Sequence, residues 1–391
     1  MFKSRSSSLV GAIFLMATSA VGPGFLTQTA LFTKELLYSF GFVLVLSTLL
    51  DIVIQLTIWQ QVTKTGMRAQ QLANSVIPYA GTGLALLVSF GGIAFNIGNL
   101  AGAALGLSLV FPSLTLIQGA IICASIAVFV LYQPFLKSGL DVFTIGMGLV
   151  LIGLLLLVVF QVDVSYEKVA KFTFFPTQFS PIATLTLVGG TVGGYISFAG
   201  AHRLIDQGVI GKDVQPYVRR SAVIGILVTA FIRFLLFLVV VGVLVKNPFL
   251  TLDASNPAAT IFIQLAGNWG RPLFGVLLWA AGITSVLGAA YTSISFLKTE
   301  FSFAEKYNLS STTGFILFSL SIFVFLGKPA SMLVLAGTLN SFVLPLGLLL
   351  LLFAGRKRKE KLSLMWEILI LGVVFLLIMM SLWPLLTYYY F

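Results

Sequence analysis

The chain is built from long apolar runs separated by short polar segments. A transmembrane helix needs about 20 consecutive apolar residues to cross the hydrocarbon core of a bilayer. This pattern predicts an all-α integral membrane protein with about eleven transmembrane helices, of which the ninth is the shortest. The predicted spans are 9–34, 40–60, 81–108, 113–132, 141–161, 183–207, 219–245, 272–297, 313–327, 330–354 and 366–389.

The N-terminal segment resembles a signal peptide, with Lys3 and Arg5 before an apolar stretch that ends in small residues. The apolar character resumes at Phe25, however, and further spans follow. We therefore interpret the segment as the first half of a transmembrane helix that is broken at residues 22–24. No long polar linker separates the spans, so we expect one transmembrane domain over residues 1–391.

Composition agrees with a membrane protein and excludes several kinds of site. The 391 residues are 58% hydrophobic and 9% charged, whereas soluble domains are about 25% charged. Cys123 and His202 are the only cysteine and histidine, so a disulfide framework, a Cys/His zinc cluster and a Cys-His catalytic pair lack their residues. We expect no cofactor and no resident metal site.

The net charge of +11 reflects topology rather than nucleic-acid binding, because the basic residues lie in short loops between the spans. Placing the N-terminus in the cytoplasm puts the larger share of lysine and arginine inside and the C-terminus outside. We expect a multi-pass protein of the plasma (inner) membrane. The residues expected inside are Lys64, Arg68, Lys137, Lys212, Arg219, Arg220, Lys298, Lys306 and the basic run 356–361.

Two helix breaks fall at corresponding positions of the two halves. The first span contains GPGFLTQTA at 22–30, and the sixth contains VGGTVGG at 188–194. Small residues can serve close helix packing, but paired breaks are typical of the substrate site of inverted-repeat transporters. The substrate-binding residues predicted here are Gly24, Thr27, Gln28, Thr29, Gly190, Thr191, Gly193, Gly194, Tyr195 and Ser197.

Six further polar residues lie within the predicted spans, and each has two interpretations. Asn96 and Asn99 share a helix face and either line the site or join two helices. Asp51 and Arg233 form a structural ion pair or take part in coupling. His202 and Arg203 follow the second break by about two turns, and they either couple a proton to transport or lie at the interface. The gating or coupling candidates are His202, Arg203, Asp51 and Arg233.

Three stretches resemble the NRAMP family of divalent-metal transporters. They are SFGF at 39–42, LLWAAGITSVLGAAYTSISF at 277–296 and MLVLAGTLNSFVLPLGLLLL at 332–351. The resemblance implies a LeuT-type fold with two inverted five-helix repeats, at about 9–161 and 183–354, plus an extra helix at 366–389. It also implies a secondary active transporter that works by alternating access, and not an enzyme.

The metal-binding motifs of that family are missing. Metal-carrying members have Asp-Pro-Gly-Asn in the first break, which here falls on residues 26–29 or 33–36, depending on the register, without an aspartate. In the second break the family's methionine and histidine fall on Gly193 and Tyr195. The family's acidic pair in the third span falls on Asn96 and Asn99. The loss of the methionine and histidine side chains is expected to leave room for a substrate larger than a bare ion.

A divalent cation needs anionic or strongly polar ligands, whereas backbone N–H groups and helix N-termini suit an anion. The expected substrate is therefore a small organic anion such as a carboxylate, with proton coupling left open. Relatives of this divergent type are often encoded near 5-oxoprolinase components, so the resemblance makes 5-oxoproline one candidate. The alternative is a transporter of hydrated Mg²⁺ or Mn²⁺. A membrane sensor or scaffold fits less well, because we expect no large soluble output module beside the spans.

Overall fold

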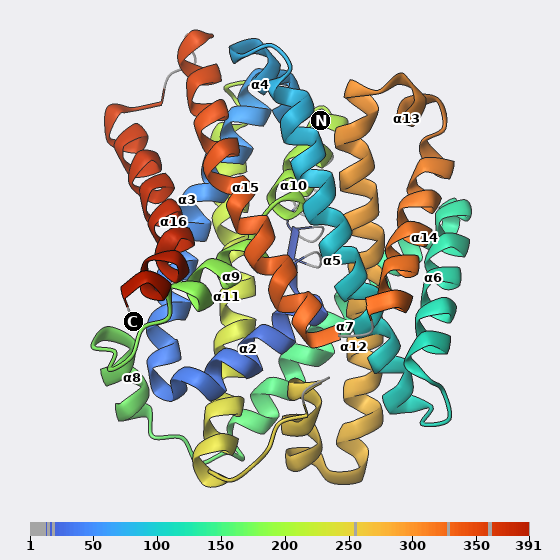
Figure 1. Ribbon diagram of the computed structural model, residues 1–391, viewed down its shortest axis with the longest axis vertical. Coiled ribbons are helices and arrows are strands. Elements are labelled where there is room, and N and C mark those ends of the chain that lie inside the picture. The colour runs from blue at the N-terminus through green and yellow to red at the C-terminus, as the bar shows by residue number, and fades with distance from the viewer. Residues whose placement is uncertain are drawn as a thin grey trace.

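The structure is a computed structural model that describes residues 13, 16, 17, 20–253, 256–326, 329–358 and 362–390. Within that part of the chain all regular elements are helices, and most run along the long axis of the molecule (Figure 1). The helices are α2 (Pro23–Leu36), η1 (Leu37–Ser39), α3 (Phe40–Thr65), α4 (Ala69–Val76), α5 (Ala80–Val110), α6 (Leu116–Tyr132), α7 (Pro134–Val159), α8 (Tyr166–Phe174), α9 (Pro181–Thr191), α10 (Tyr195–Asp206), α11 (Gln215–Lys246), α12 (Pro257–Glu300), α13 (Ser302–Lys306), α14 (Asn308–Leu326), α15 (Pro329–Lys357) and α16 (Leu364–Tyr390).

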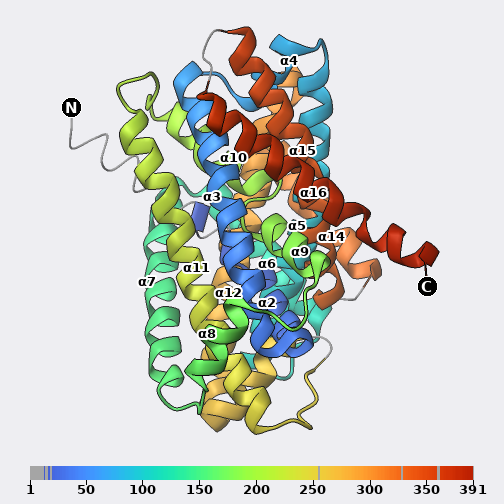
Figure 2. The ribbon, with the colours of Figure 1, turned by 90° about the vertical axis from the view of Figure 1, so that its left-hand side faces the viewer.

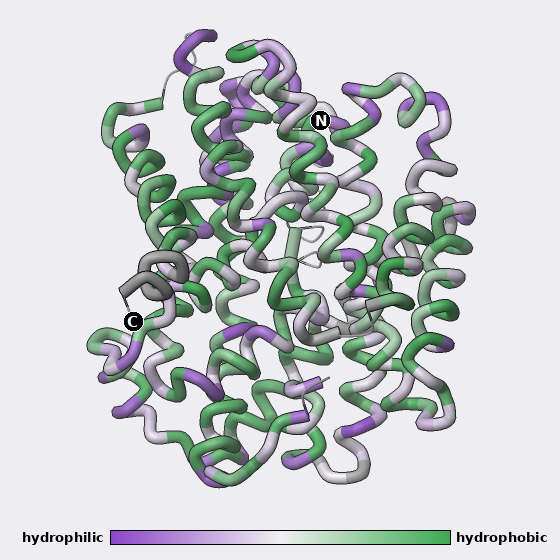
Figure 3. The backbone as a smooth tube through the Cα atoms, in the orientation of Figure 1, coloured by the Kyte–Doolittle hydropathy of each residue, from purple (hydrophilic) through white to green (hydrophobic). Residues whose placement is uncertain are grey.

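The described helices confirm a multi-pass membrane protein. Eight helical stretches are long and apolar enough to cross a membrane, and one of them, Pro23–Thr65, contains both α2 and α3. α6 and residues Gly148–Val159 of α7 are shorter apolar helices. The short ninth span corresponds to α14. Hydrophilic segments gather mainly at the two ends of the long axis, with α4 and α13 at one end and α8 at the other (Figures 1 and 3).

Helices that hold the same place in the two halves pack against one another. α2 contacts α9, α3 lies along α11, and α5 lies along α12 (Figures 1 and 2). Small residues let the backbones of α5 and α12 approach closely: a methyl group added at Gly106 would meet the backbone of Gly275 and Trp279. This pairing holds the two interrupted helices side by side at the centre of the protein.

The crossing of α9 and α15 is equally close. A Cβ atom at Gly189 would overlap the carbonyl of Gly337, and one at Gly337 would meet the carbonyl of Thr186. Only glycine allows the two helices to touch at this point. The crossing positions α15 directly beside the second helix break.

Replacing Gly189 with alanine is expected to destabilise the protein, because the added methyl group overlaps the Gly337 carbonyl. Overpacking of this kind costs about 1–3 kcal/mol, so the thermal unfolding midpoint in detergent should fall. Gly314→Ala is the matched control: α14 leaves open space there, and both variants gain the same helix propensity. Equal midpoints for the two variants would contradict the proposed role of Gly189.

Candidate functional site

The first helix break lies where the sequence predicts it. Val21 and Gly22 are not helical, and α2 begins at Pro23, where a proline costs no helical hydrogen bond. Most of the polar candidates are nevertheless outside the unwound backbone, because they belong to the first turns of α2. This corrects the expectation that they form the break itself. The residues concerned are Gly24, Thr27, Gln28 and Thr29.

The second break is shorter than the glycine pattern suggests. α9 continues through Gly190 to Thr191, and α10 begins at Tyr195, so the interruption is limited to residues 192–194. Gly194 has a φ of 48°, a backbone conformation that strongly favours glycine. Of the predicted glycines in this segment, Gly193 and Gly194 therefore shape the break, whereas Gly190 lies in a regular helix.

The two half-helices that follow the breaks have no side-chain caps. Gly22 precedes α2 and Gly194 precedes α10, and neither helix has an acidic residue in its first turn. In contrast, α6, α8 and α9 are capped by Thr115, Ser165 and Ser180. The uncapped N-termini keep their partial positive charge, which favours an anion.

Gln28 fills the space beside the second break. Its amide Nε2 donates a hydrogen bond of 3.0 Å to the Leu333 carbonyl of α15, and its Oε1 has no partner among the described residues. Cβ atoms added at Gly190 or Gly337 would meet this amide. Gln28 therefore lies between α9 and α15 at a point where both helices carry glycine.

Asn340 of α15 is a central residue that the sequence analysis missed. Its Nδ2 donates to the carbonyls of Gly91 in α5 and Ala336, each at 2.9 Å. A Cβ atom at Gly194 would overlap its Oδ1, which has no partner in the described structure. Gly337 and Asn340 are three residues apart on one helix face, and this was the available signal.

The missing metal-site side chains do not leave an open space. A Cβ atom at Gly193 would overlap the backbone of Gly189. Tyr195 is completely buried and packs edge-on against Phe95, with ring centroids 5.5 Å apart. The expectation of extra room is therefore wrong for this closed conformation, in which side chains from other helices occupy the space.

Asp51 and Arg233 meet at the end of α9. Arg233 of α11 donates from Nη1 to Thr191 Oγ1 at 2.9 Å, and its guanidinium carbon lies 4.1 Å from the centre of the Phe25 ring. Asp51 of α3 interacts with both Arg233 and Thr191. All three polar residues are buried, yet Arg233 Nε and Nη2 have no hydrogen-bond acceptor within the described chain.

The two asparagines of α5 face different neighbours. Asn96 donates from Nδ2 to Ser319 of α14 at 3.4 Å, away from the breaks. Asn99 lies beside Gly22 and faces the hydroxyl of Tyr195, although that hydroxyl does not reach hydrogen-bond geometry. Asn99 is thus next to both breaks, whereas Asn96 joins two helices.

The remaining candidates follow the second break in the sequence and lie in α10. Ser197 is buried, and its carbonyl accepts a 3.0 Å hydrogen bond from the indole of Trp59. His202 is fully buried between the rings of Phe198 and Phe296. Its Nδ1 lies 3.3 Å from Ser295 Oγ, and its Nε2 accepts from the Ala69 N–H at 3.5 Å, which assigns its proton to Nδ1.

Polar side chains join three helices at the end of the molecule where α4 lies, and we call this group of contacts the latch. Arg68, just before α4, forms an ion pair of 2.5 Å with Asp206 at the end of α10, and Asp206 also accepts from the Tyr291 hydroxyl of α12 at 3.0 Å. Arg68 further donates to Ser295 at 2.5 Å. Arg203, the other coupling candidate, lies close enough to Tyr291 to interact with it electrostatically. The latch joins α4, α10 and α12.

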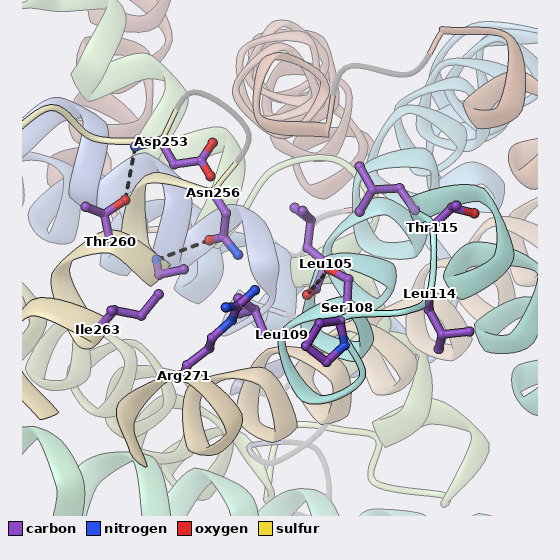
Figure 4. A pocket seen from close by; sticks show the side chains of 13 residues that line it. Leu105, Ser108, Leu109, Leu114, Thr115, Asp253, Asn256, Thr260, Ile263 and Arg271 are labelled. Carbon is purple, nitrogen blue, oxygen red and sulfur yellow. Dashed lines mark hydrogen bonds between the residues drawn. The ribbon is translucent and has the colours of Figure 1, made fainter. Parts of the chain in front are cut away.

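A cavity of about 590 Å³ opens at the opposite end, away from the breaks. It lies between the end of α5, the start of α6, Asp253 and residues 256–271, and the Arg271 side chain projects into it (Figure 4). The backbone N–H of Asp253 donates to Thr260 Oγ1 at 3.0 Å across one wall. None of the predicted site residues lines this cavity, so we do not assign it the substrate.

The centre itself is closed and contains few charges. The described polar candidates beside the breaks are 0–4% exposed, and Asp51 and Arg233 are the charged pair among them. Across the described residues, no group of three or more His, Cys, Asp or Glu side chains could hold a metal ion. The centre is therefore built from amides, hydroxyls, uncapped helix ends and two buried side chains of opposite charge, Asp51 and Arg233.

The chain is similar to a known protein family and to two membrane proteins. The model of the family "Natural resistance-associated macrophage protein-like" (Nramp) matches residues 13–387. An uncharacterized membrane protein of Haemophilus influenzae is 49% identical over 351 residues (90% of this chain, 88% of that protein), and YcsG of Bacillus subtilis is 48% identical over 352 residues (90% and 86%).

Solved structures show the same fold. A manganese transporter from Eremococcus coleocola superposes with a TM-score of 0.74 at 16% identity, covering 96% of this chain and 85% of that one. Mhp1, a nucleobase-cation-symport-1 family transporter, superposes with a TM-score of 0.61 at 17% identity, covering 91% and 79%. These structures confirm the LeuT-type fold, in which an interrupted helix begins each five-helix repeat.

Weakening the latch should open the end of the molecule that carries it. In Asp206→Asn, Arg68 and Tyr291 lose their charged partner, and hydrogen bonds to charged groups contribute about 1.5–3 kcal/mol each. A cysteine at the buried Ser197 position should then react with maleimide about tenfold faster, as followed by mass spectrometry. The exposed Asp213→Asn change is the control, and an unchanged rate in Asp206→Asn would show that the latch does not close this end.

Proposed function

This chain belongs to the Nramp family, and from that premise we propose that it carries a small organic carboxylate across the membrane by alternating access. Members of the family are transporters and not enzymes, and the LeuT-type fold of this chain agrees with transport. The substrate enters the space between the two helix breaks. The single transmembrane domain covers residues 1–391.

The observation that carries the proposal is the buried guanidinium of Arg233. It lies beside the second break, held by Thr191 and the Phe25 ring, and its Nε and Nη2 are still able to donate. Arginine presents parallel N–H donors that match both oxygens of a carboxylate. A guanidinium at this point can donate to an anion but has no acceptor to offer a metal ion.

The helix ends support the same substrate class. The N-termini of α2 and α10 present backbone N–H groups at the breaks, and no described side chain caps them with a hydrogen bond. Asp51 offsets the charge of Arg233 while the site is empty. Arg233, Thr191, Asn99 and Tyr195 are therefore the proposed contacts, with Gln28 and Asn340 as amides that pair with polar groups of the substrate.

Alternating access requires the closed centre to open towards each side in turn. The latch formed by Arg68, Asp206 and Tyr291 gates the end that the charge asymmetry predicts to be cytoplasmic. The proposal includes uptake through the plasma membrane with the N-terminus inside. The proposal also includes proton coupling, for which His202 and Arg203, next to the latch, are the candidate residues. 5-oxoproline, a cyclic carboxylate with a ring amide, is one candidate for a site that offers both a guanidinium and amides.

A second candidate function is transport of hydrated Mn²⁺ or Mg²⁺. The fold is shared with a manganese transporter, and two neutral oxygens beside the second break, Gln28 Oε1 and Asn340 Oδ1, have no partner in the described chain. Neutral oxygens suit an ion that keeps part of its water. The buried Arg233 weighs against this candidate.

Flux measurements separate the two functions. In proteoliposomes with an imposed pH gradient, labelled small carboxylates, including 5-oxoproline, should enter in a saturable manner. Mn²⁺ and Mg²⁺ should give no saturable entry and no heat of binding in titration calorimetry. Saturable Mn²⁺ flux without any carboxylate flux would overturn the proposal.

Arg233→Lys should impair carboxylate transport while keeping the buried positive charge. Lysine cannot offer the parallel donors of arginine, and losing one charge-assisted hydrogen bond lowers the apparent affinity by about tenfold or more. Lys246→Gln, at the exposed far end of the same helix, is the control.

The charge-balanced double variant Asp51→Asn/Arg233→Gln gives an independent check, since it leaves no unpaired buried charge. It should fold, as judged by its thermal midpoint and a monodisperse elution profile, but should transport no carboxylate. Wild-type flux in this variant would remove Arg233 from the site.

A further inference from the structure

A second cavity, of about 840 Å³, lies between α3, α11 and α16, at the end that carries the latch. Lys64, Arg219 and Arg220 contribute positive charge, and no carboxylate occurs among the described residues that line it. The nearby Glu367 is buried and bonded to Arg356 at 2.6 Å, so its charge is already balanced. The cavity is therefore distinctly cationic.

The donors in this cavity are positioned by the fold. Arg219 Nε donates to Gln60 Oε1 at 3.2 Å, which fixes the guanidinium at the α3 side of the cavity. The Trp366 indole N–H lines the cavity and has no partner in the described chain. The first turn of α11, which begins at Gln215, lacks both a side-chain cap and an acidic residue, so its helix dipole adds positive potential.

Apolar residues also line the cavity and continue onto an exposed apolar surface of α11. Leu56, Val223 and Ile224 lie among its lining residues. Ile224, Leu227 and Phe231 are 38%, 50% and 48% exposed, and their spacing puts them on one face of α11 that runs away from the cations. A charged group at the mouth and an apolar face below it match an amphipathic ligand.

We propose that this cavity binds the phosphate headgroup of an anionic phospholipid, whose acyl chain lies along the exposed face of α11. Basic cavities between transmembrane helices at the cytoplasmic surface have the charge and position to hold acidic headgroups. Trp366 adds an interfacial anchor, because its ring is apolar and its N–H can donate to a phosphate oxygen. A free phosphate would use the same cations but gain nothing from the apolar face.

The test uses the full chain in detergent. Native mass spectrometry measures which lipids remain bound to it. With equimolar phosphatidylglycerol and phosphatidylcholine, the protein should retain phosphatidylglycerol selectively. Each cation near the membrane surface strengthens binding of an acidic lipid by about fivefold, so Arg220→Gln should retain about fivefold less. Lys306→Gln removes an exposed cation from the same end, outside the cavity, and should retain as much as the wild type.

The triple variant Lys64→Gln/Arg219→Gln/Arg220→Gln should lose the preference for phosphatidylglycerol altogether. Its elution profile and unfolding midpoint in phosphatidylcholine confirm that it is folded. A parallel arm adds inorganic phosphate to lipid-free protein and follows the unfolding midpoint. Equal retention of both lipids, unchanged retention in the triple variant, or stabilisation by phosphate but not by phosphatidylglycerol would each overturn the proposal.

Discussion

The need to satisfy unpaired backbone groups inside a membrane governs this structure. No water is available in the hydrocarbon core, so a helix can be interrupted there only where other protein groups surround the break. Here two breaks lie together, enclosed by α3, α5, α11, α12 and α15. The close packing of α5 on α12 and of α9 on α15 follows from this requirement, as do the glycines that permit it.

The side chains around the two breaks are mainly neutral polar groups. Gln28 and Asn340 lie where the glycines of α9, α10 and α15 leave space, and each donates to a distant backbone carbonyl. Amides can donate and accept without the cost of burying a charge. The exception is the pair of Asp51 and Arg233, whose charges offset one another beside Thr191. Among the described residues this centre lacks a group of three or more His, Cys, Asp or Glu side chains that could hold a metal ion.

The helices could be predicted from sequence because a run of about 20 apolar residues is a local and strong signal. The apolar run of α14 gave such a signal although it is short. The break before Pro23 was predictable for another local reason, the Gly-Pro-Gly sequence at residues 22–24. The details of the centre could not be predicted in the same way. Gln28 bonds to Leu333, 305 residues away, and Asn96 and Asn99 turn towards different helices despite sharing a face. Such contacts depend on how helices pack, and the local pattern carries no record of that packing. Asn340 was missed for the same reason, because its bond to Gly91 joins residues that are 249 positions apart.

The closed centre also constrains how a substrate can bind. A ligand entering between the breaks must displace Gln28 or Asn340, because the glycines leave no free volume beside them. Losing an amide-to-carbonyl hydrogen bond costs about 1 kcal/mol net, whereas each bond from a charged donor to a carboxylate contributes about 1.5–3 kcal/mol. For the proposed carboxylate this exchange is favourable, because its oxygens can accept from the unpartnered Nε and Nη2 of Arg233. In the proposed transport cycle Asp51 would balance Arg233 once the carboxylate leaves, so the empty carrier would move no uncompensated charge through the membrane. Neutral amides beside two opposite charges would thus suit the release of the proposed substrate as well as its binding.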